Sequence, residues 1–203
     1  MSADHSFPEQ VTERTFPAGK LRKLEGPDRE QMLPVAPLVA ALGVASGDCV
    51  ADIGAGTGYL SLPLAAAAGP KGVVHAVDMQ QPMLDYLGDK LQKQAVTNVQ
   101  LHLGSSSQTG LDTASVQLAF YCNVWHEIHE PLLALHEARR ILAPGGRIAI
   151  CDWRVDATPN AGPPIDIRIP EAGLTAMLEK DGWHSILCSH AGQFNFLAIA
   201  TRG

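Results

Sequence analysis

Three glycines at alternate positions form the most informative pattern in the chain. Gly54, Gly56 and Gly58 lie between an apolar run and a segment rich in Ala and Leu. Glycine lets the backbone turn tightly and lets a ligand approach the main chain without meeting a Cβ atom. A helix that starts directly afterwards supplies free N–H groups with partial positive charge. The segment therefore predicts a loop that binds a small polar ligand.

The spacing of these glycines argues against two common nucleotide-binding loops. A nicotinamide- or flavin-binding loop has the pattern G-x-G-x-x-G. Counted from Gly54, its third glycine would fall at position 59, where the chain has Tyr59. A Walker loop is also absent, because no Gly-Lys-Ser/Thr sequence follows. The observed G-x-G-x-G is a poor pyrophosphate cradle, and a nicotinamide-dependent oxidoreductase stays only as an alternative.

A single acidic residue follows the glycine loop at a distance that suits nucleoside recognition. Asp78 ends a second apolar run, 20 residues after Gly58. A carboxylate at this point of a βαβ unit can accept hydrogen bonds from both ribose hydroxyls. Taken alone, Asp78 could equally be a strand-end residue that starts the next helix. The combination of glycine loop and acid favours a nucleoside ligand.

A second group of candidate residues lies where the fourth and fifth predicted strands end, which is where open α/β sheets place their crevice. His126 suits a substrate-side base or hydrogen-bond partner, and Asp152 suits a base or a ligand for a polar substrate group. The alternatives are a packed histidine and a charge paired with Arg154 or Arg168. His126 and His129 are three residues apart and could share a helical face, but the HExxH spacing is absent and no metal site is predicted.

Alternating strand and helix signals position these residues. Strands separated by helices of about 10–15 residues imply βαβ units and a mostly parallel, doubly wound α/β sheet. The last two strands have no helix between them, so we expect them to pair antiparallel. The predicted strands cover residues 49–53, 72–77, 99–103, 116–122, 147–151, 185–188 and 194–200. One predicted helix starts at residue 28. The others cover residues 37–42, 59–68, 82–94, 131–142 and 170–181.

The length favours one domain with a full core of its own, since the chain has 203 residues. Residues 1–36 have little periodicity and several prolines, and we interpret them as an N-terminal arm or lid. Residues 37–203 form the predicted ligand-binding catalytic domain. The four cysteines are scattered without a CxxC pair, which predicts neither a disulfide framework nor a zinc site.

Charge and hydropathy exclude several classes of partner. The formal net charge is −6 and no basic stripe is visible, so no nucleic-acid partner is expected. No apolar run reaches the roughly 18 residues of a spanning helix, and residues 1–10 lack an apolar signal core. We therefore expect no membrane association and a cytoplasmic location. Nothing in the sequence indicates an oligomeric state.

Three segments together resemble a known family. Residues 50–58 (VADIGAGTG), residues 77–79 (VDM) and residues 143–147 (APGGR) are similar to motifs of class I S-adenosylmethionine-dependent methyltransferases. Residues 123–127 (NVWHE) and Trp153 resemble small bacterial and archaeal members, akin to methyltransferases of quinone biosynthesis and to arsenite methyltransferases. The resemblance spans roughly residues 20–200 and implies a Rossmann-like sheet of seven strands.

The resemblance also implies a role for each residue that matches a family motif. Gly54, Gly56 and Gly58 would line the methionine moiety and the ribose of S-adenosylmethionine, and Asp52 would orient the loop and reach the amino group. Asp78 would hold the ribose diol. Met79 would pack on the adenine. Asn123 would face the methionine part and the transferred methyl.

One position departs from the family pattern. The loop after the third strand usually carries an Asp that binds the adenine amino group, and this chain has Ser105 there. Ser106 or the main chain are the alternatives for that contact.

The function implied is methyl transfer from S-adenosylmethionine to a small-molecule acceptor by in-line displacement. In such a reaction the protein chiefly positions the nucleophile and the methyl carbon, and a general base is needed only if the acceptor arrives protonated. Arsenite as acceptor would need thiolates, and Cys122 and Cys151 are the cysteines that could approach the crevice. A cofactor-binding protein without catalysis and a protein-modifying enzyme stay as alternatives.

Overall fold

The computed structural model describes Gly26, residues 28–158 and residues 162–203. Most of the predicted N-terminal arm, residues 1–25 and Pro27, lies outside the described residues. The part of the arm that is described contains helix α1, Asp28–Met32, and the start of α2, Val35–Leu42.

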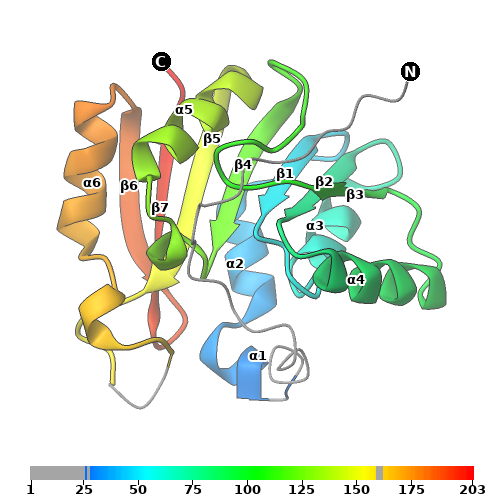
Figure 1. The fold of residues 1–203 in the computed structure, drawn as a ribbon, viewed down its shortest axis with the longest axis horizontal. Coiled ribbons are helices and arrows are strands. Elements are labelled where there is room, and N and C mark those ends of the chain that lie inside the picture. The colour runs from blue at the N-terminus through cyan, green and yellow to red at the C-terminus, as the bar shows by residue number, and fades with distance from the viewer. Residues whose placement is uncertain (1–25, 27, 159–161) are drawn as a thin grey trace.

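A seven-stranded sheet forms the centre of the molecule, in the order β3-β2-β1-β4-β5-β7-β6 (Figure 1). All neighbours pair in parallel except β7, which pairs antiparallel with both β5 and β6. The predicted fold class, a doubly wound and mostly parallel sheet with an antiparallel last pair, is confirmed. The strands are β1 Cys49–Ile53, β2 Val73–Asp78, β3 Val99–Leu103, β4 Val116–Cys122, β5 Leu142–Trp153, β6 His184–Ala191 and β7 Asn195–Thr201.

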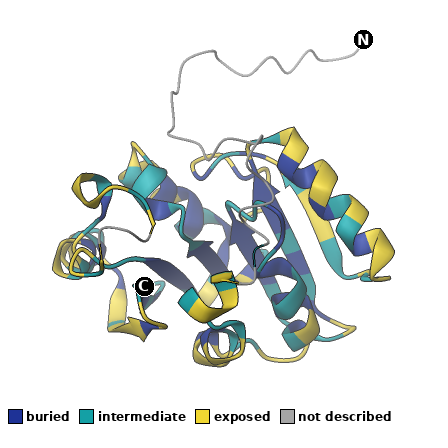
Figure 2. Ribbon diagram, turned by 90° about the horizontal axis from the view of Figure 1, so that it is seen from below, coloured by how far each residue is buried: buried dark blue, intermediate teal, exposed yellow. Residues whose placement is uncertain are grey.

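Helices cover both faces of the sheet because neighbouring strand residues point to opposite sides. In β1, Val50 belongs to the hydrophobic cluster that contains the leucines of α2 and α3, whereas Ala51 belongs to the cluster on the other face, which contains residues of α5 and α6. Both residues are fully buried, as expected for a central strand of a two-sided parallel sheet. Figure 2 shows the buried strands between helices whose outer faces are exposed. The remaining helices are α3 Ser61–Ala68, α4 Gln81–Lys93, α5 Pro131–Ile141 and α6 Glu171–Lys180.

Two elements, β5 and α2, begin two or more residues earlier than predicted. β5 begins at Leu142 rather than at Arg147, because Leu142 pairs with Val116 while Arg147 already pairs with Leu118. Residues 143–146 therefore form an excursion between the two pairings, with Gly145 at φ 75°. The Pro and Gly residues of this excursion look like a helix stop in the sequence.

The helix α2 begins at Val35, two residues before the predicted restart at Pro37. Pro34 takes the position before the helix and Pro37 falls in its first turn, where a missing N–H costs no helical hydrogen bond. The predicted boundary between residues 36 and 37 thus falls inside a helix. Across the described part of the chain, no helix has the length and apolar character needed to cross a membrane.

Candidate active site

A cavity of about 410 Å³ lies along one edge of the sheet. Its walls include the last residues of four parallel strands, Ile53, Asp78, Cys122 and Trp153, and the first residue of β7, Asn195. Because β7 runs antiparallel to β5, its first residue lies at the same edge. The volume falls in the range of roughly 300–1,000 Å³ typical of small-molecule sites. The place is the crevice that the parallel sheet predicts.

The glycine loop closes tightly over the end of β2. The amide N–H groups of Gly54 and Ala55 both donate to Val77 O, at 2.8 and 3.0 Å. Gly54 has φ 74°, and a Cβ atom there would lie 2.7 Å from Val124 Cγ2. Gly54 and Gly56 line the cavity, as predicted, whereas Gly58 packs against Leu87 and is not part of the cavity wall. Only two of the three glycines therefore offer their main chain to a ligand.

Asp78 ties β2 to the glycine loop. Its Oδ2 accepts a hydrogen bond from the Gly56 amide at 2.8 Å, and its Oδ1 accepts one from the Gln80 amide at 2.9 Å. Burial raises the pKa of Asp78 above its ordinary value, while these backbone donors oppose that rise. The carboxylate lines the cavity, and the neighbouring Met79 lines it with a side chain that is 39% exposed. The predicted pairing of glycine loop and acid is thus present in space.

Asp52 lies behind the loop rather than in the cavity wall. Its Oδ2 accepts a hydrogen bond of 2.6 Å from Ser61 Oγ at the start of α3. Burial, reinforced by the charge of Asp78, raises the pKa of Asp52 to about 6, despite the hydrogen bond from Ser61 and the charge of Arg29. This geometry fits the predicted orienting role. Asp52 does not line the cavity, however, so the structure gives it no direct contact with a ligand there.

Ser105 and Ser106 both line the cavity where β3 ends. The main chain of Ser105 exchanges two hydrogen bonds with Gln108, and its hydroxyl lies 3.3 Å from that of Ser107. Ser106 is the more buried of the two residues. The hydroxyl groups of this loop and its main chain thus occupy the position at which the family pattern has an Asp.

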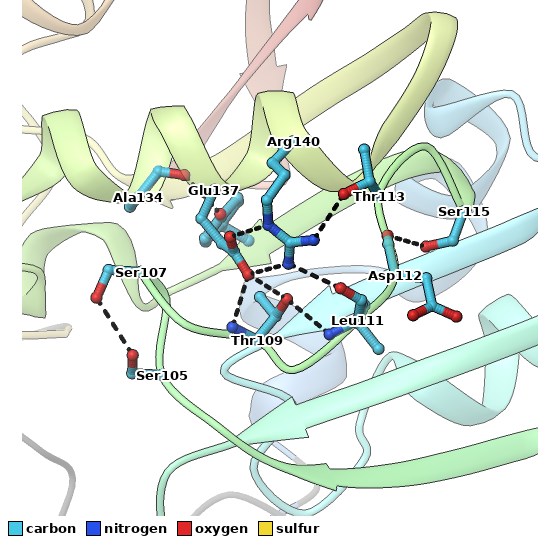
Figure 3. A network of polar contacts seen from close by, with 11 residues as sticks. Ser105, Ser107, Thr109, Leu111, Asp112, Thr113, Ser115, Ala134, Glu137 and Arg140 are labelled. Carbon is cyan, nitrogen blue, oxygen red and sulfur yellow. Dashed lines mark hydrogen bonds and ion pairs between the residues drawn. The ribbon is translucent and has the colours of Figure 1, made fainter. Parts of the chain in front are cut away.

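A partly buried ion pair on α5 fixes the same loop to that helix (Figure 3). Glu137 accepts hydrogen bonds from the amide and the hydroxyl of Thr109, at 2.8 and 2.6 Å, and pairs with Arg140 at 2.7 Å. Arg140 also donates to Leu111 O at 2.7 Å. Burial alone would raise the pKa of Glu137, but the hydrogen bonds from Arg140 and Thr109 outweigh it and lower this pKa. The network holds the serine loop in place from outside the cavity.

At the other end of the cavity His126 and Asp152 form a hydrogen-bonded pair. His126 Nδ1 lies 2.8 Å from Asp152 Oδ1, and the His126 amide donates to Asp152 Oδ2 at 2.9 Å. The Trp153 amide also donates to Asp152 Oδ1, at 2.7 Å. His126 lines the cavity, whereas Asp152 is buried behind it. The structure thus joins the two predicted catalytic residues but gives only His126 access to a ligand.

The environment of His126 makes it more basic. Burial alone would lower the pKa of His126, but the hydrogen bond and charge of Asp152 and the charge of Glu127 outweigh it, so the pKa is raised. With Nδ1 bonded to Asp152, the Nε2 atom is the one left to accept a proton. The predicted helical face shared with His129 does not form, because the 3₁₀ helix η2 spans only Trp125–Glu127. His129 is exposed and is not part of the cavity wall.

Asn123 and Asn195 meet in the wall of the cavity. Asn195 Nδ2 donates to Asn123 Oδ1 at 2.6 Å, and the Asn123 amide donates to Cys151 O at 2.8 Å. Asn123 adopts the left-handed backbone region, with φ 56°, directly after β4. Both carboxamides line the cavity. The sequence pointed to Asn123 but not to Asn195, which comes from a strand 72 residues further along.

Comparison with known proteins places this geometry in a family. A family model described as a methyltransferase domain matches residues 50–146. A solved S-adenosylmethionine-dependent methyltransferase from Aquifex aeolicus is 28% identical, with a TM-score of 0.88 over 93% of this chain and 100% of that one.

Two curated relatives point the same way. An arsenite methyltransferase of Halobacterium salinarum is 28% identical over 72% of this chain and 40% of its own length. A ubiquinone/menaquinone biosynthesis C-methyltransferase of Burkholderia mallei is 31% identical over 57% of this chain and 47% of its own length. The chain therefore spans less than half the length of these two relatives.

In sequence and in fold the chain is similar to the class I S-adenosylmethionine-dependent methyltransferases, in agreement with the predicted family. This similarity implies S-adenosylmethionine as the cofactor. The nicotinamide-dependent alternative falls away, in agreement with the missing third glycine of its loop.

Unpaired buried atoms of this chain fit a polar ligand in the cavity. Thr57 Oγ1 and Asn195 Oδ1 are buried without a hydrogen-bond partner among the described residues, and both residues line the cavity. A third such atom, Trp125 Nε1, lies in the core. Native proteins leave few buried polar groups unpaired, so a bound ligand is the natural partner for the first two. An adenosyl amino acid beside the glycine loop carries groups that pair with a hydroxyl such as that of Thr57.

Arg29 is a cavity residue that the sequence did not single out. Its guanidinium lies 4.1 Å from the centre of the Tyr59 ring and lines the cavity from α1. The Tyr59 hydroxyl lies within hydrogen-bond distance of both Glu30 Oε2 and Leu33 O, at 2.9 and 3.0 Å. Tyr59 directly follows the glycine loop, so it anchors α1 beside that loop. Over the described residues, no group of three or more His, Cys, Asp or Glu is arranged to hold a metal ion.

Proposed function

We propose that the chain transfers a methyl group from S-adenosylmethionine to a small-molecule acceptor. One observation carries the proposal: a single cavity has the Asp78–glycine-loop unit at one end and the Asp152–His126 pair at the other. The first unit suits a nucleoside and the second suits proton transfer. A site with both is organised for reaction as well as for cofactor binding.

The cofactor would lie along the glycine loop. We assign the ribose hydroxyls to Asp78, the adenine to Met79, Ser105 and Ser106, and the methionine part to Gly54 and Gly56 with Asn123. Asp52 would orient the loop through Ser61, and Gly58 would provide the close packing against Leu87. These assignments follow the family motifs and agree with the places of the residues around the cavity.

Arg29 would bind the carboxylate of the methionine moiety. It is the one Lys or Arg among the described residues of the cavity wall, and it lies beside the glycine loop. Its helix α1 belongs to the predicted arm of residues 1–36, so the arm would act as a lid on the domain of residues 37–203. A guanidinium pairs well with a carboxylate in a partly enclosed site.

The His126–Asp152 pair would remove a proton from the methyl acceptor. When bound, S-adenosylmethionine supplies an activated methyl: the acceptor lone pair forms the new bond to its carbon while the carbon–sulfur bond breaks and that electron pair stays on sulfur. His126 Nε2 would take the proton of the acceptor atom, and Asp152 would stabilise the resulting imidazolium through Nδ1. Asn123 and Trp153 would hold the acceptor in line.

The acceptor would be a neutral organic molecule rather than arsenite. Cys122 lines the cavity, but its strand neighbour Cys151 is fully buried. The adjoining Cys122 and burial raise the pKa of Cys151 well above that of a free thiol, which disfavours the thiolate that arsenite binding needs. The aromatic face of Trp153 and the side chains of Val124 and Ile128 suit an apolar acceptor body.

Transfer of a radiolabelled methyl group tests the proposal. The protein is incubated with labelled S-adenosylmethionine and either a small-molecule extract or a protein fraction of cells. We expect label in the small-molecule fraction, a loss of about 100-fold or more in His126→Ala, and no loss in the exposed control His129→Asn. Label in the protein fraction alone would contradict the small-molecule acceptor. Binding of S-adenosylhomocysteine with no transfer to either fraction would identify a cofactor-binding protein without catalysis.

A further inference from the structure

The position of Asn195 marks the acceptor end of the cavity. Along the sheet edge the strands follow in the order β2-β1-β4-β5-β7, with Asp78 at the end of β2 and Asn195 at the start of β7. Asn195 stands opposite Trp153 in the β5–β7 register. A ligand that places its ribose at Asp78 and its methionine part at the glycine loop on β1 leaves the ends of β5 and β7 to a second molecule.

Asn195 is held so that one atom stays unpaired. The residue is 0% exposed, and its Nδ2 is used by Asn123 Oδ1. Its Oδ1 has no partner among the described residues. The backbone of Asn123 is fixed by the hydrogen bond from its main-chain N–H to Cys151 O. Asn195 is part of the cavity wall, so a bound molecule with a donor is the available partner for its carbonyl oxygen and would offset the cost of leaving that atom unpaired.

The charge at this end of the cavity disfavours an anionic acceptor. Glu127 and the His126–Asp152 pair lie there. The only Lys or Arg of the described wall, Arg29, is on α1 next to the glycine loop. Arg168 lies behind Trp153, where its buried guanidinium donates to Arg154 O and Pro163 O. An acceptor with a carboxylate or phosphate would therefore meet the carboxylates of Glu127 and Asp152 first. A neutral hydroxyl or N–H group, by contrast, matches both the Asn195 carbonyl and the imidazole.

We infer that the methyl acceptor is a neutral molecule with a hydroxyl or N–H group, and that Asn195 selects it by accepting a hydrogen bond from that group. This inference rests on the proposed function and names the class of its acceptor. Asn195 is a specificity residue in this account: its carbonyl accepts the hydrogen bond of the hydroxyl or N–H group when the acceptor binds. At transfer His126 Nε2 takes a proton of that group, and for a hydroxyl this is the same proton, so its hydrogen bond to Asn195 breaks as the new bond to the methyl carbon forms. Trp153 supplies the flat apolar surface beside it.

Fragments that differ by one donor test the inference. With the protein saturated in S-adenosylhomocysteine, phenol is compared with anisole, and aniline with N,N-dimethylaniline. Binding is followed by the nuclear magnetic resonance shift of the Trp153 indole N–H, assigned with Trp153→Phe. We expect the donor-bearing member of each pair to bind at least about fivefold more tightly, the effect of one buried hydrogen bond. Equal binding within both pairs would overturn the inference.

A variant of Asn195 ties the preference to this residue. Asn195→Leu keeps the approximate size of the side chain and removes the carbonyl, so the preference for phenol over anisole should vanish. If Asn195→Leu does not melt cooperatively, Asn195→Ser carries this arm, because its short side chain leaves the acceptor out of reach. A preference that persists in the folded variant would contradict the role of Asn195. Failure of wild-type protein to bind S-adenosylhomocysteine would instead contradict the proposed function.

Discussion

Two aspartates at strand ends show how burial divides similar residues into different roles. Asp78 and Asp152 each end a parallel strand and each accept backbone hydrogen bonds. Asp78 faces the cavity, whereas Asp152 is covered by His126. The sequence could place both residues at the crevice edge, since strand ends are predictable. It could not tell which carboxylate reaches a ligand, because that depends on the path of the chain around residues 123–128.

The raised pKa of His126 predicts a shifted pH profile. A base must be unprotonated, so kcat/KM should rise with pH and level off above the pKa of His126, higher than for an ordinary histidine. Asp152→Asn removes the charge that raises this pKa. For Asp152→Asn we expect kcat/KM to rise at a lower pH than in the wild type, and its plateau value at high pH to be lower by about tenfold or more. Measurement of kcat/KM against pH for both proteins checks this, and an unmoved rise in Asp152→Asn would contradict the pairing.

Asp52 predicts a pH-dependent stability. Its folded-state pKa of about 6 lies above the ordinary value of 3.8, so the folded protein holds a proton that the unfolded chain has lost. Its contribution to stability is present below pH 3.8 and is lost as pH rises through about 6. Asp52→Asn should therefore gain stability relative to wild type, on the order of 3 kcal/mol between pH 4 and 7. Urea unfolding at both pH values measures the free energy of unfolding of each protein. A difference between Asp52→Asn and wild type that is the same at both pH values would refute the prediction.

At the scale of elements, α1 depends on contacts made far along the chain. Tyr59 holds it beside the glycine loop, and the β6–β7 turn packs under it, where a Cβ atom on Gly192 would lie 2.6 Å from Met32 O. A five-residue helix is not stable alone, so these contacts determine its position. The position of α1 is thus coupled to the glycine loop through Tyr59.

Removal of one hydroxyl tests this coupling. Tyr59→Phe loses the hydrogen bonds to Glu30 and Leu33 but keeps the ring under Arg29. We expect faster amide hydrogen exchange in residues 28–33 and affinity for S-adenosylhomocysteine about three- to tenfold lower, as for one or two lost hydrogen bonds. The exposed Tyr86→Phe serves as the control. Unchanged exchange in α1 would show that Tyr59 does not hold it.

Three strands were predictable because their short segments are rich in apolar residues. β1, β3 and β4 have the predicted limits, since each is a short apolar run bounded by loop residues. β5 and α2 differ because a proline or glycine breaks a helix or strand only where its N–H is needed or its φ is unsuitable. At Pro37 and in residues 143–146 the local geometry tolerates them. Whether a proline or glycine is tolerated is therefore determined by the neighbouring strands and turns, and cannot be read from the segment alone.

For the whole molecule, the order of strands brings the site together. Residues from the ends of β1, β2, β4 and β5 meet because parallel strands share an edge, and this follows from the sequence pattern. Asn195 and Arg29 join them only through the antiparallel β7 and through α1, which long-range packing positions. Sequence reasoning therefore predicted the residues at the ends of the parallel strands but missed Asn195 and Arg29.

The central claim is that the crevice binds the adenosyl cofactor through Asp78 and the glycine loop. Calorimetric titration with S-adenosylhomocysteine measures it most directly, on wild type, on Asp78→Ala and on the exposed control Asp85→Ala from the adjoining α4. The account predicts one site per chain, affinity at least about tenfold weaker in Asp78→Ala, as for a lost charge-assisted hydrogen bond, and no change in Asp85→Ala. No binding by wild type at millimolar ligand, or equal affinity in Asp78→Ala, would contradict it.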